Sequence, residues 1–402
     1  MYLKHLSLTN FRSFARLDMD IPRHTLLLVG DNAQGKTSIL EAIYFLATFT
    51  SLQASHDRQL INFLLEDEPI KVGRLVADLQ RGEQSHRLEV RLILDANAVN
   101  GARLRKEILV DGVKRSLQEA LGIFNAVIFL PQMTRIIEGG PEERRKYLNL
   151  GLSQVYPGYA RALTEYAQLI TRRNALLKQL GERGGDPDQL IYWDNLLTQR
   201  GALIVKARLT ALAGLNHLAS AVHDRLSSGM EVLQLLYKPS VQPLAEENAQ
   251  ASFLSADFTE DSDEDSIRRA FAQQLRNRRS EEIARGVTVC GPHRDDFRFV
   301  SNGVDLGDFG SRGQVRTALL ALKLAEVSWM RARTGEWPVL LLDETLAELD
   351  PQRRTDLMTV LQECDQAVLT TTDLSQFAEP FLSECAIWQV RSGSVQHASA
   401  YS

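Results

Sequence analysis

Gly30-Asp31-Asn32-Ala33-Gln34-Gly35-Lys36-Thr37 is the stretch of sequence that decides the fold. It fits the phosphate-loop pattern G-x-x-x-x-G-K-[ST] at every fixed position. The apolar run at residues 24–29 predicts a buried strand before the loop, and apolar residues at helical spacing over residues 38–49 predict a helix after it. A strand, this loop and a helix together form the context in which the pattern predicts a nucleotide site.

Each residue type in this loop has a chemical role. Gly30 and Gly35 allow the tight turn that points successive backbone N–H groups at one phosphate, and the helix N-terminus adds a favourable partial charge. We expect Lys36 to reach the β- and γ-phosphates of ATP and the Thr37 hydroxyl to bind Mg²⁺. The predicted ATP-binding residues of the loop are Gly30, Asp31, Asn32, Ala33, Gln34, Gly35, Lys36, Thr37 and Ser38.

A second apolar run, at residues 338–342, ends in two carboxylates, Asp343 and Glu344. The run predicts a buried strand that ends at the carboxyl edge of the sheet, where Asp343 can hold the water shell of Mg²⁺. Glu344 is expected to point the other way along the strand and to orient or deprotonate the attacking water. We therefore assign catalysis to Lys36, Asp343 and Glu344; an acidic turn after a core strand is the alternative.

The segment Ser311-Arg312-Gly313-Gln314 resembles the signature motif of ABC-type ATPases, and Ala347-Glu348-Leu349-Asp350 resembles their D-loop. In that superfamily the signature serine and the helix after it face the γ-phosphate of ATP bound by the other subunit. The resemblance implies that Ser311, Gly313 and Gln314 contact the ATP of a second copy, so that ATP links a homodimer. It also implies that Gln132 is the Q-loop glutamine that reaches Mg²⁺, with a plain turn residue as the alternative.

A closer resemblance, which covers nearly the whole chain, is to the RecF family of bacterial recombination-repair proteins, whose heads are similar to those of SMC proteins. It rests on the stretches LSLTNFRSF (6–14), FLPQ (129–132), GPEERRKYL (140–148), RNALLK (173–178) and GPHRDD (291–296), together with Tyr166. The chain departs from the family at three places: Asn149 and Glu344 stand where Asp is usual, and Ala347 replaces the usual D-loop Ser. Thr370-Thr371-Thr372-Asp373 contains no switch His, which the family permits.

The RecF resemblance implies an ATP-dependent DNA-binding protein of DNA replication, DNA recombination, DNA repair and the SOS response. ATP would close a homodimer as a clamp on gapped DNA, duplex or a single-strand/duplex junction. The dimer would help to load the RecA recombinase with RecO and RecR, and slow, weak, DNA-stimulated hydrolysis would release it. A non-hydrolysing ATP-bound scaffold of the SMC/ABC head class is the alternative, which Ala347 leaves open. A transporter ATPase subunit is disfavoured by the long helical insertion.

The predicted elements define an α/β fold, an ABC-type P-loop ATPase head with a mixed sheet and a helical lobe inserted in the chain. We predict a discontinuous lobe I from residues 1–145 and 285–402. Lobe II is predicted from residues 146–284, with an exposed acidic loop near 244–266. No heptad pattern persists long enough for the coiled-coil arms of an SMC protein.

Several local patterns predict turns, strands and buried positions. Asp111-Gly112 and Asn302-Gly303 predict two-residue hairpin turns. The runs 287–289 and 297–300 predict strands, and Ile267, Phe271 and Leu275 mark one face of a helix that ends near residue 283. Cys290 and Cys364 are predicted to be small core residues. The cluster His293-Arg294-Asp295-Asp296 is predicted to form an exposed loop on the dimer or DNA surface rather than a metal site.

Composition bounds the function without deciding it. A chain of 402 residues with 44% hydrophobic content can form two to three domains. Three cysteines without metal or disulfide spacing, and the lack of a signal peptide, predict a cytoplasmic protein. No apolar run approaches the ~20 residues that cross a bilayer.

Charge is the weak point of the DNA hypothesis. The net charge is −5, so DNA binding depends on local clusters of basic residues rather than on the total. Each cluster taken alone is more typical of a solvated face. The clusters are Arg103 with Arg105 and Lys106; Lys114 with Arg115; Arg144 with Arg145 and Lys146; and Arg268, Arg269, Arg276, Arg278 and Arg279.

Overall fold

The computed structural model describes residues 1–65, 68–95, 103–244, 258–344 and 351–397. The D-loop residues 347–350 and most of the predicted acidic loop lie outside these ranges. The chain forms two compact units: the first joins Met1–Met133 to Lys323–Ser402, and the second is Thr134–Leu322. One boundary falls inside helix α10 (Arg312–Thr334). The predicted limits of the two functional lobes, at residues 145 and 285, stay a prediction.

The first unit contains a six-stranded antiparallel sheet in the order β2-β1-β4-β5-β6-β7. Side chains alternate across it: β2 buries Phe14, Leu17 and Met19 and exposes the residues between them. At the β6–β7 turn Asp111 and Gly112 have φ values of 51° and 78°, which confirms the predicted two-residue hairpin. The strands are β1 (Tyr2–Phe11), β2 (Phe14–Asp20), β4 (Ile70–Arg81), β5 (Gln84–Asp95), β6 (Arg103–Val110) and β7 (Val113–Arg115).

A second six-stranded sheet of the same unit, in the order β15-β14-β3-β13-β12-β8, carries the phosphate loop. Neighbours from β14 to β8 pair in parallel and β15 pairs antiparallel with β14, so the predicted mixed sheet is confirmed. Every residue of β12 is buried, as expected of a central parallel strand. The strands are β3 (Thr25–Val29), β8 (Ala126–Phe129), β12 (Val339–Asp343), β13 (Ala367–Thr371), β14 (Ala386–Arg391) and β15 (Ser394–His397).

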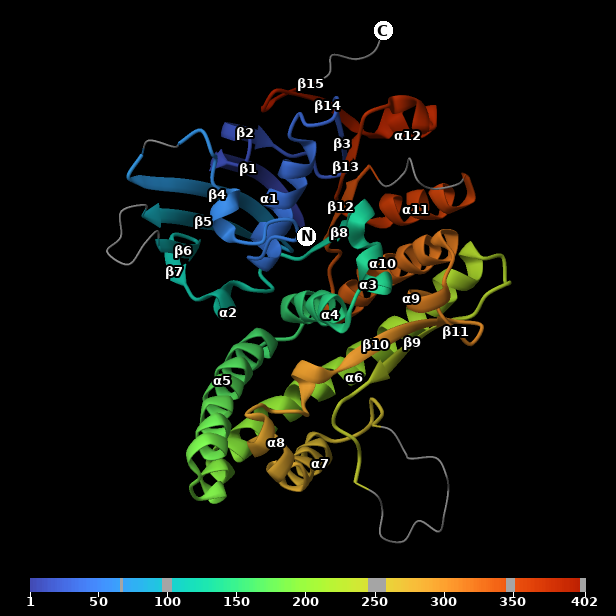
Figure 1. The fold of residues 1–402 in the computed structure, drawn as a ribbon. Coiled ribbons are helices and arrows are strands. Elements are labelled where there is room, and N and C mark those ends of the chain that lie inside the picture. Colours follow the sequence, from blue (N-terminus) through green and yellow to red (C-terminus); the bar gives the residue numbers. More distant parts are fainter. Residues whose placement is uncertain (66–67, 96–102, 245–257, 345–350, 398–402) are drawn as a thin grey trace. The chain divides into compact units, whose positions relative to one another are not determined.

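Helix α1 (Lys36–Thr48) follows the phosphate loop and lies between the two sheets of the first unit (Figure 1). It contacts β4 and β5 of one sheet and β8, β12 and β13 of the other. Because both sides are covered, most of its residues are buried, including Ile39, Leu40 and Ile43. The other helices of this unit are α2 (Leu117–Ala120), α11 (Pro351–Glu363) and α12 (Glu379–Glu384).

The second unit is built on an antiparallel pair of long helices, α5 (Tyr159–Arg183) and α6 (Leu190–Leu226), which lie side by side (Figure 1). Helix α5 buries Tyr159, Tyr166 and Leu177. The shorter helices are α3 (Arg135–Glu138), α4 (Pro141–Val155), α7 (Glu264–Asn277), α8 (Arg279–Arg285) and α9 (Leu306–Phe309). A three-stranded sheet comprises β9 (Leu233–Lys238), β10 (Asp296–Ser301) and β11 (Val304–Asp305).

Two predictions of secondary structure for this unit are wrong. Residues 287–289 form no strand, because side chains bind their backbone N–H groups: Asn174 Oδ1 accepts from Thr288 N at 2.8 Å, and Glu282 Oε1 accepts from Val289 N at 2.9 Å. The partner of β10 is instead β9, which was not predicted. The helix predicted to end near residue 283 is also interrupted at Arg278, where α7 ends and α8 begins.

Candidate nucleotide site

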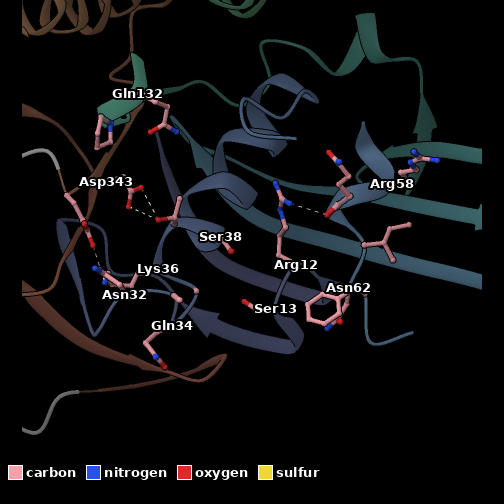
Figure 2. A pocket seen from close by; sticks show the side chains of 18 of the residues that line it. Arg12, Ser13, Asn32, Gln34, Lys36, Ser38, Arg58, Asn62, Gln132 and Asp343 are labelled. Atoms are coloured by element: carbon pink, nitrogen blue, oxygen red, sulfur yellow. Dashed lines mark hydrogen bonds and ion pairs between the residues drawn. The ribbon is translucent and has the colours of Figure 1, made fainter. Parts of the chain in front are cut away.

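A cavity of about 800 Å³ opens over the phosphate loop within the first unit (Figure 2). Residues from the loop, from the segment before β4 and from the end of β12 line it. These are Arg12, Ser13, Asn32, Ala33, Gln34, Gly35, Lys36, Thr37, Ser38, Arg58, Gln59, Ile61, Asn62, Phe63, Lys71, Leu94, Pro131, Gln132, Asp343 and Glu344. Gly30 and Asp31, both predicted to bind ATP, do not line it. Their backbone carbonyls accept hydrogen bonds from Lys36 instead.

The loop closes around its own lysine. Lys36 Nζ donates to the carbonyl oxygens of Gly30 at 2.6 Å and Asp31 at 3.0 Å. Gly35 adopts φ 108°, and a Cβ atom there would lie 2.9 Å from the Phe14 ring, so both the conformation and the packing require glycine. Gln34 Oε1 accepts a hydrogen bond from Ser392 N at 2.6 Å, which ties the loop to the β14–β15 turn.

The structure brings the two predicted carboxylates to the start of α1. Thr37 Oγ1 lies 3.0 and 2.9 Å from the two carboxylate oxygens of Asp343, and Glu344 Oε1 lies 3.3 Å from Lys36 Nζ. Burial raises the pKa of Asp343, against hydrogen bonds from Thr370 and Thr37 that lower it. The carboxylate is thus placed where a positive ligand would replace lost hydration.

The expected direction of Glu344 is wrong. The residue lies past the end of β12 with φ 48°, a left-handed backbone rather than a strand, and its side chain turns back toward Lys36. Both carboxylates therefore face the phosphate loop, instead of alternating across the sheet.

The donor set fits Mg²⁺ bound together with a nucleotide. Thr37 and Asp343 offer a hydroxyl and a carboxylate, which are the hard oxygen ligands that Mg²⁺ prefers. Over the described ranges no group of three or more His, Cys, Asp or Glu residues could hold a metal ion on its own. This agrees with the usual mode of Mg²⁺ binding, in which one or two carboxylates act with substrate phosphates and water. Gln132 lies in the turn Pro131–Thr134 on the cavity wall and adds an amide oxygen.

Two residues that line the cavity, Arg12 and Phe63, are not among the predicted site residues. Arg12, in the β1–β2 turn, has φ 52° and is held by Glu41, whose two carboxylate oxygens each lie 2.7 Å from its guanidinium. It also donates to Gln59 O at 3.2 Å. The only sequence signal for Arg12 was the family resemblance of residues 6–14. Phe63, which is 68% exposed beside the cavity, gave no signal, because an exposed apolar residue is common on any surface.

The signature residues Ser311, Gly313 and Gln314 belong to the second unit, and none of them is among the residues that line the cavity. Ser311 and Gln314 form a reciprocal cap at the start of α10: Ser311 Oγ accepts from Gln314 N at 3.2 Å, and Gln314 Oε1 accepts from Ser311 N at 3.0 Å. Ser311 and Gly313 are exposed. The motif thus presents an ordered helix start at the surface of its own unit.

The cluster at residues 293–296 is not the exposed loop that was predicted. Asp295 is 1% exposed and bonds to Arg208 Nη1 at 2.8 Å, to the Tyr237 hydroxyl and to Ser240 N at 2.8 Å. His293 is half-buried, with the Tyr166 hydroxyl 2.9 Å from its Nδ1. Arg294 alone is exposed. The polar residues of this motif serve the interior of the second unit.

Comparisons with known proteins agree with this geometry. The model of the RecF/RecN/SMC N terminal domain family matches residues 2–389. The chain is 39% identical over 404 residues to the DNA replication and repair protein RecF of Roseiflexus castenholzii, covering 98% of this chain and 99% of that protein. It is also 39% identical over 406 residues to the RecF of Chloroflexus aurantiacus, with the same coverage.

Solved structures give the same result. The structure of the recombination mediator protein RecF-ATP of the RecFOR pathway superposes with a TM-score of 0.83 at 31% identity, covering 99% of this chain and 98% of that one. An SMC head bound to the C-terminal winged-helix domain of ScpA matches at a TM-score of 0.50 and 14% identity, a likeness of fold alone.

One mixed sheet carries both the phosphate loop and the strand that ends in Asp343. Together with the family match, this arrangement defines the head of an ABC-type ATPase of the SMC class. Within that class, similarity over almost the full length of the RecF proteins decides the family. The chain belongs to the RecF family of DNA replication and repair proteins.

Proposed function

We propose that this chain is an ATP-dependent DNA-binding protein of recombinational repair. ATP binding with Mg²⁺ closes a homodimer on gapped DNA or at a single-strand/duplex junction. The closed dimer helps mediators of the RecO and RecR type to load the recombinase RecA, and slow hydrolysis releases it. The single observation that carries the proposal is the cavity in which Lys36, Thr37 and Asp343 converge. The similarity of the chain to a solved recombination mediator protein with ATP supports it.

The residues of the cavity have distinct roles in this proposal. Lys36, which now bonds two loop carbonyls, transfers its N–H groups to the β- and γ-phosphates. The Thr37 hydroxyl and Asp343 hold the metal ion, which neutralises phosphate charge when it is bound. Glu344 orients the attacking water or accepts its proton.

The homodimer in this proposal rests on the exposed start of helix α10, which carries the signature motif. Ser311 and Gly313 are exposed at the capped start of α10, which is 23 residues long and presents backbone N–H groups to an anion. A nucleotide held in the cavity of one copy and contacted by Ser311 of another stabilises the dimer by its preference for the closed state.

Glu344→Gln separates a hydrolytic cycle from the alternative, a non-hydrolysing scaffold. The amide keeps the shape of the side chain and removes its charge and basicity. In a cycle, the variant binds ATP, loses most hydrolysis and accumulates ATP-bound dimers in sedimentation velocity. An unchanged dimer population and unchanged phosphate release would favour the scaffold, and a parent chain that forms no dimer with ATP contradicts the clamp.

The DNA surface in this proposal is the open face of the antiparallel sheet. The register and the alternation of β1–β7 place seven basic residues on that face. Among the described residues near them, four carboxylates share the face: Asp78, Glu89, Asp95 and Glu107. The basic residues, which we call the basic face, are Arg16, Arg74, Arg87, Arg91, Arg103, Arg105 and Lys114.

Ion pairs within the basic face fix the guanidinium groups that would bind DNA phosphates. Glu89 accepts from Arg74 Nε at 2.8 Å and from Arg91 Nε at 2.6 Å, so one carboxylate fixes two exposed guanidinium groups. The hydrogen bond from Arg74 lowers the pKa of Glu89, which keeps the carboxylate charged. The side chains of Arg74, Arg91 and Arg105 are 43%, 41% and 63% exposed, so they can reach a DNA backbone. Toward the β2 edge the face becomes acidic, at Asp18 and Asp20.

A pair of charge reversals tests this surface. Arg103→Glu with Arg105→Glu should weaken ATP-dependent binding to duplex and gapped DNA and lower the slope of log K against log[salt] by about two. The matched control, Arg268→Glu with Arg276→Glu, reverses two exposed arginines of α7 and should leave binding near the parent value. If the control loses binding and the first variant does not, the surface lies in the second unit.

A further inference from the structure

Thr370 contacts both of the predicted catalytic acidic residues, through the carboxylate of Asp343 and the backbone N–H of Glu344. It lies in β13, directly opposite Asp343 in the register of β12 and β13, and is 3% exposed. Its Oγ1 donates to Asp343 Oδ1 at 2.7 Å and accepts from Glu344 N at 3.1 Å. One hydroxyl therefore uses its donor and an acceptor position on two consecutive residues.

The bond to Glu344 N stabilises an unusual turn. A left-handed backbone is unfavourable for a residue other than glycine, and Glu344 has φ 48°. Thr370 holds the N–H of that residue, and Lys36 lies 3.3 Å from its carboxylate. These two contacts fix the turn that brings Glu344 back to the phosphate loop.

The bond from Thr370 is one of two hydroxyl contacts that hold the carboxylate of Asp343. Thr37 approaches the carboxylate from α1 and Thr370 approaches it from β13, so hydroxyls on two different elements orient it. A carboxylate held in this way keeps its oxygens directed at one position, which is what a ligand of a metal–nucleotide complex requires.

We propose that Thr370 is a positioning residue that sets the orientation of both Asp343 and Glu344 for binding and hydrolysis of Mg²⁺–ATP. The inference rests on the proposed nucleotide function. The neighbouring residue supplies a contrast, because the Thr371 hydroxyl donates to Asp373 O at 2.9 Å and accepts from Asp373 N at 3.1 Å. Thr371 is equally buried, at 3% exposure, but its hydroxyl bonds a turn.

The test compares Thr370→Val, Thr370→Ser and Thr371→Val in the full chain. A fluorescent ATP analogue is titrated at increasing Mg²⁺ concentration, and hydrolysis is followed in parallel. Thr370→Val should raise the Mg²⁺ concentration for half-maximal binding and lower kcat, each by about 10- to 100-fold. Thr370→Ser restores the hydroxyl and should return both values toward those of the parent, whereas Thr371→Val should match the parent in both.

Thermal unfolding separates a positioning role from a structural one. If Thr370→Val unfolds, Thr370→Ala removes the hydroxyl without placing a methyl group against Asp343 and is measured instead. One outcome is a variant without the hydroxyl that unfolds at a lower temperature and still has the same Mg²⁺ dependence and kcat as Thr371→Val. That result overturns the positioning role of Thr370 but leaves the proposed function standing. If the parent chain binds no nucleotide, the proposed function fails and the inference falls with it.

Discussion

Lys36 in the first unit and Arg208 in the second are both cations whose side chains are only 3% exposed, yet they are buried in different ways. Lys36 bonds two carbonyls of its own loop and lies beside Glu344, whose side chain is 40% exposed. Arg208 bonds Asp295, which is 1% exposed, together with Pro292 O at 2.6 Å and Asn149 Oδ1 at 3.1 Å.

The difference separates binding groups from structural ones. The partners of Lys36 are backbone oxygens and a half-solvated carboxylate, so it can exchange them for phosphate at small cost. Two of the partners of Arg208, Asp295 and Pro292, are buried, and each would lose a hydrogen bond that water cannot replace. Burial and charge alone therefore do not distinguish Lys36 from Arg208, whereas the exposure of their hydrogen-bond and ion-pair partners does.

The largest effect is expected for Arg208→Met. The change leaves Asp295 buried without its guanidinium partner, and breaking a buried pair in this way destabilises a protein by about 3–5 kcal/mol. The urea midpoint of the second unit should fall, while molecules that remain folded keep their nucleotide affinity. Arg225→Met, an exposed position on the same helix, is the control. Equal urea midpoints for Arg208→Met and Arg225→Met would contradict the structural role of Arg208.

Lys36→Met should give the opposite pattern. Its partners can be solvated or can bond elsewhere in the loop, so the free energy of unfolding in urea should change by less than about 1 kcal/mol. Affinity for an ATP analogue should fall by about 100-fold or more, because an ammonium group buried against phosphate is lost. Lys178→Met, whose parent side chain is 71% exposed, controls for the loss of a lysine. A strongly destabilised Lys36→Met chain would show that the lysine is structural as well.

A smaller effect sharpens the view of the second unit. Burial lowers the pKa of His293 to about 4, so the folded chain keeps this ring neutral where the unfolded chain protonates it. The stability that depends on the neutral ring is complete above the unfolded pKa near 6.5 and is lost as pH falls from about 6.5 to about 4. Over that window the free energy of unfolding in urea should fall more for the parent than for His293→Gln, by up to about 3 kcal/mol. Parallel curves would contradict the shift.

Local patterns predicted the parts of the site that are contiguous in the sequence. The strand before the phosphate loop, helix α1 and strand β12 follow from apolar runs and glycines within a few residues of one another, and the structure confirms each of them. The hairpin turn at Asn302-Gly303 was predictable for the same reason, because its φ values of 49° and 81° suit those two residue types.

Features that depend on distant residues were not predictable. β9 lies about sixty residues before its partner β10 in the sequence, and nothing local marks the pairing. The direction of Glu344 depends on Thr370, a residue of the next strand. The burial of Asp295 depends on Arg208 and Tyr237 from other elements, whereas a run of charged residues by itself predicts a surface loop.

The place of β3 in its sheet has a consequence for synthesis on the ribosome. This strand begins at Thr25 and pairs with β13 and β14, which begin at Ala367 and Ala386. At the usual pace of translation, roughly 5–20 residues per second, β3 waits roughly 20–70 seconds for the neighbours that cover its edges. An apolar strand left unpaired for that time is an aggregation hazard. Nascent chains should therefore gain a protease-resistant nucleotide site only after the last strands emerge.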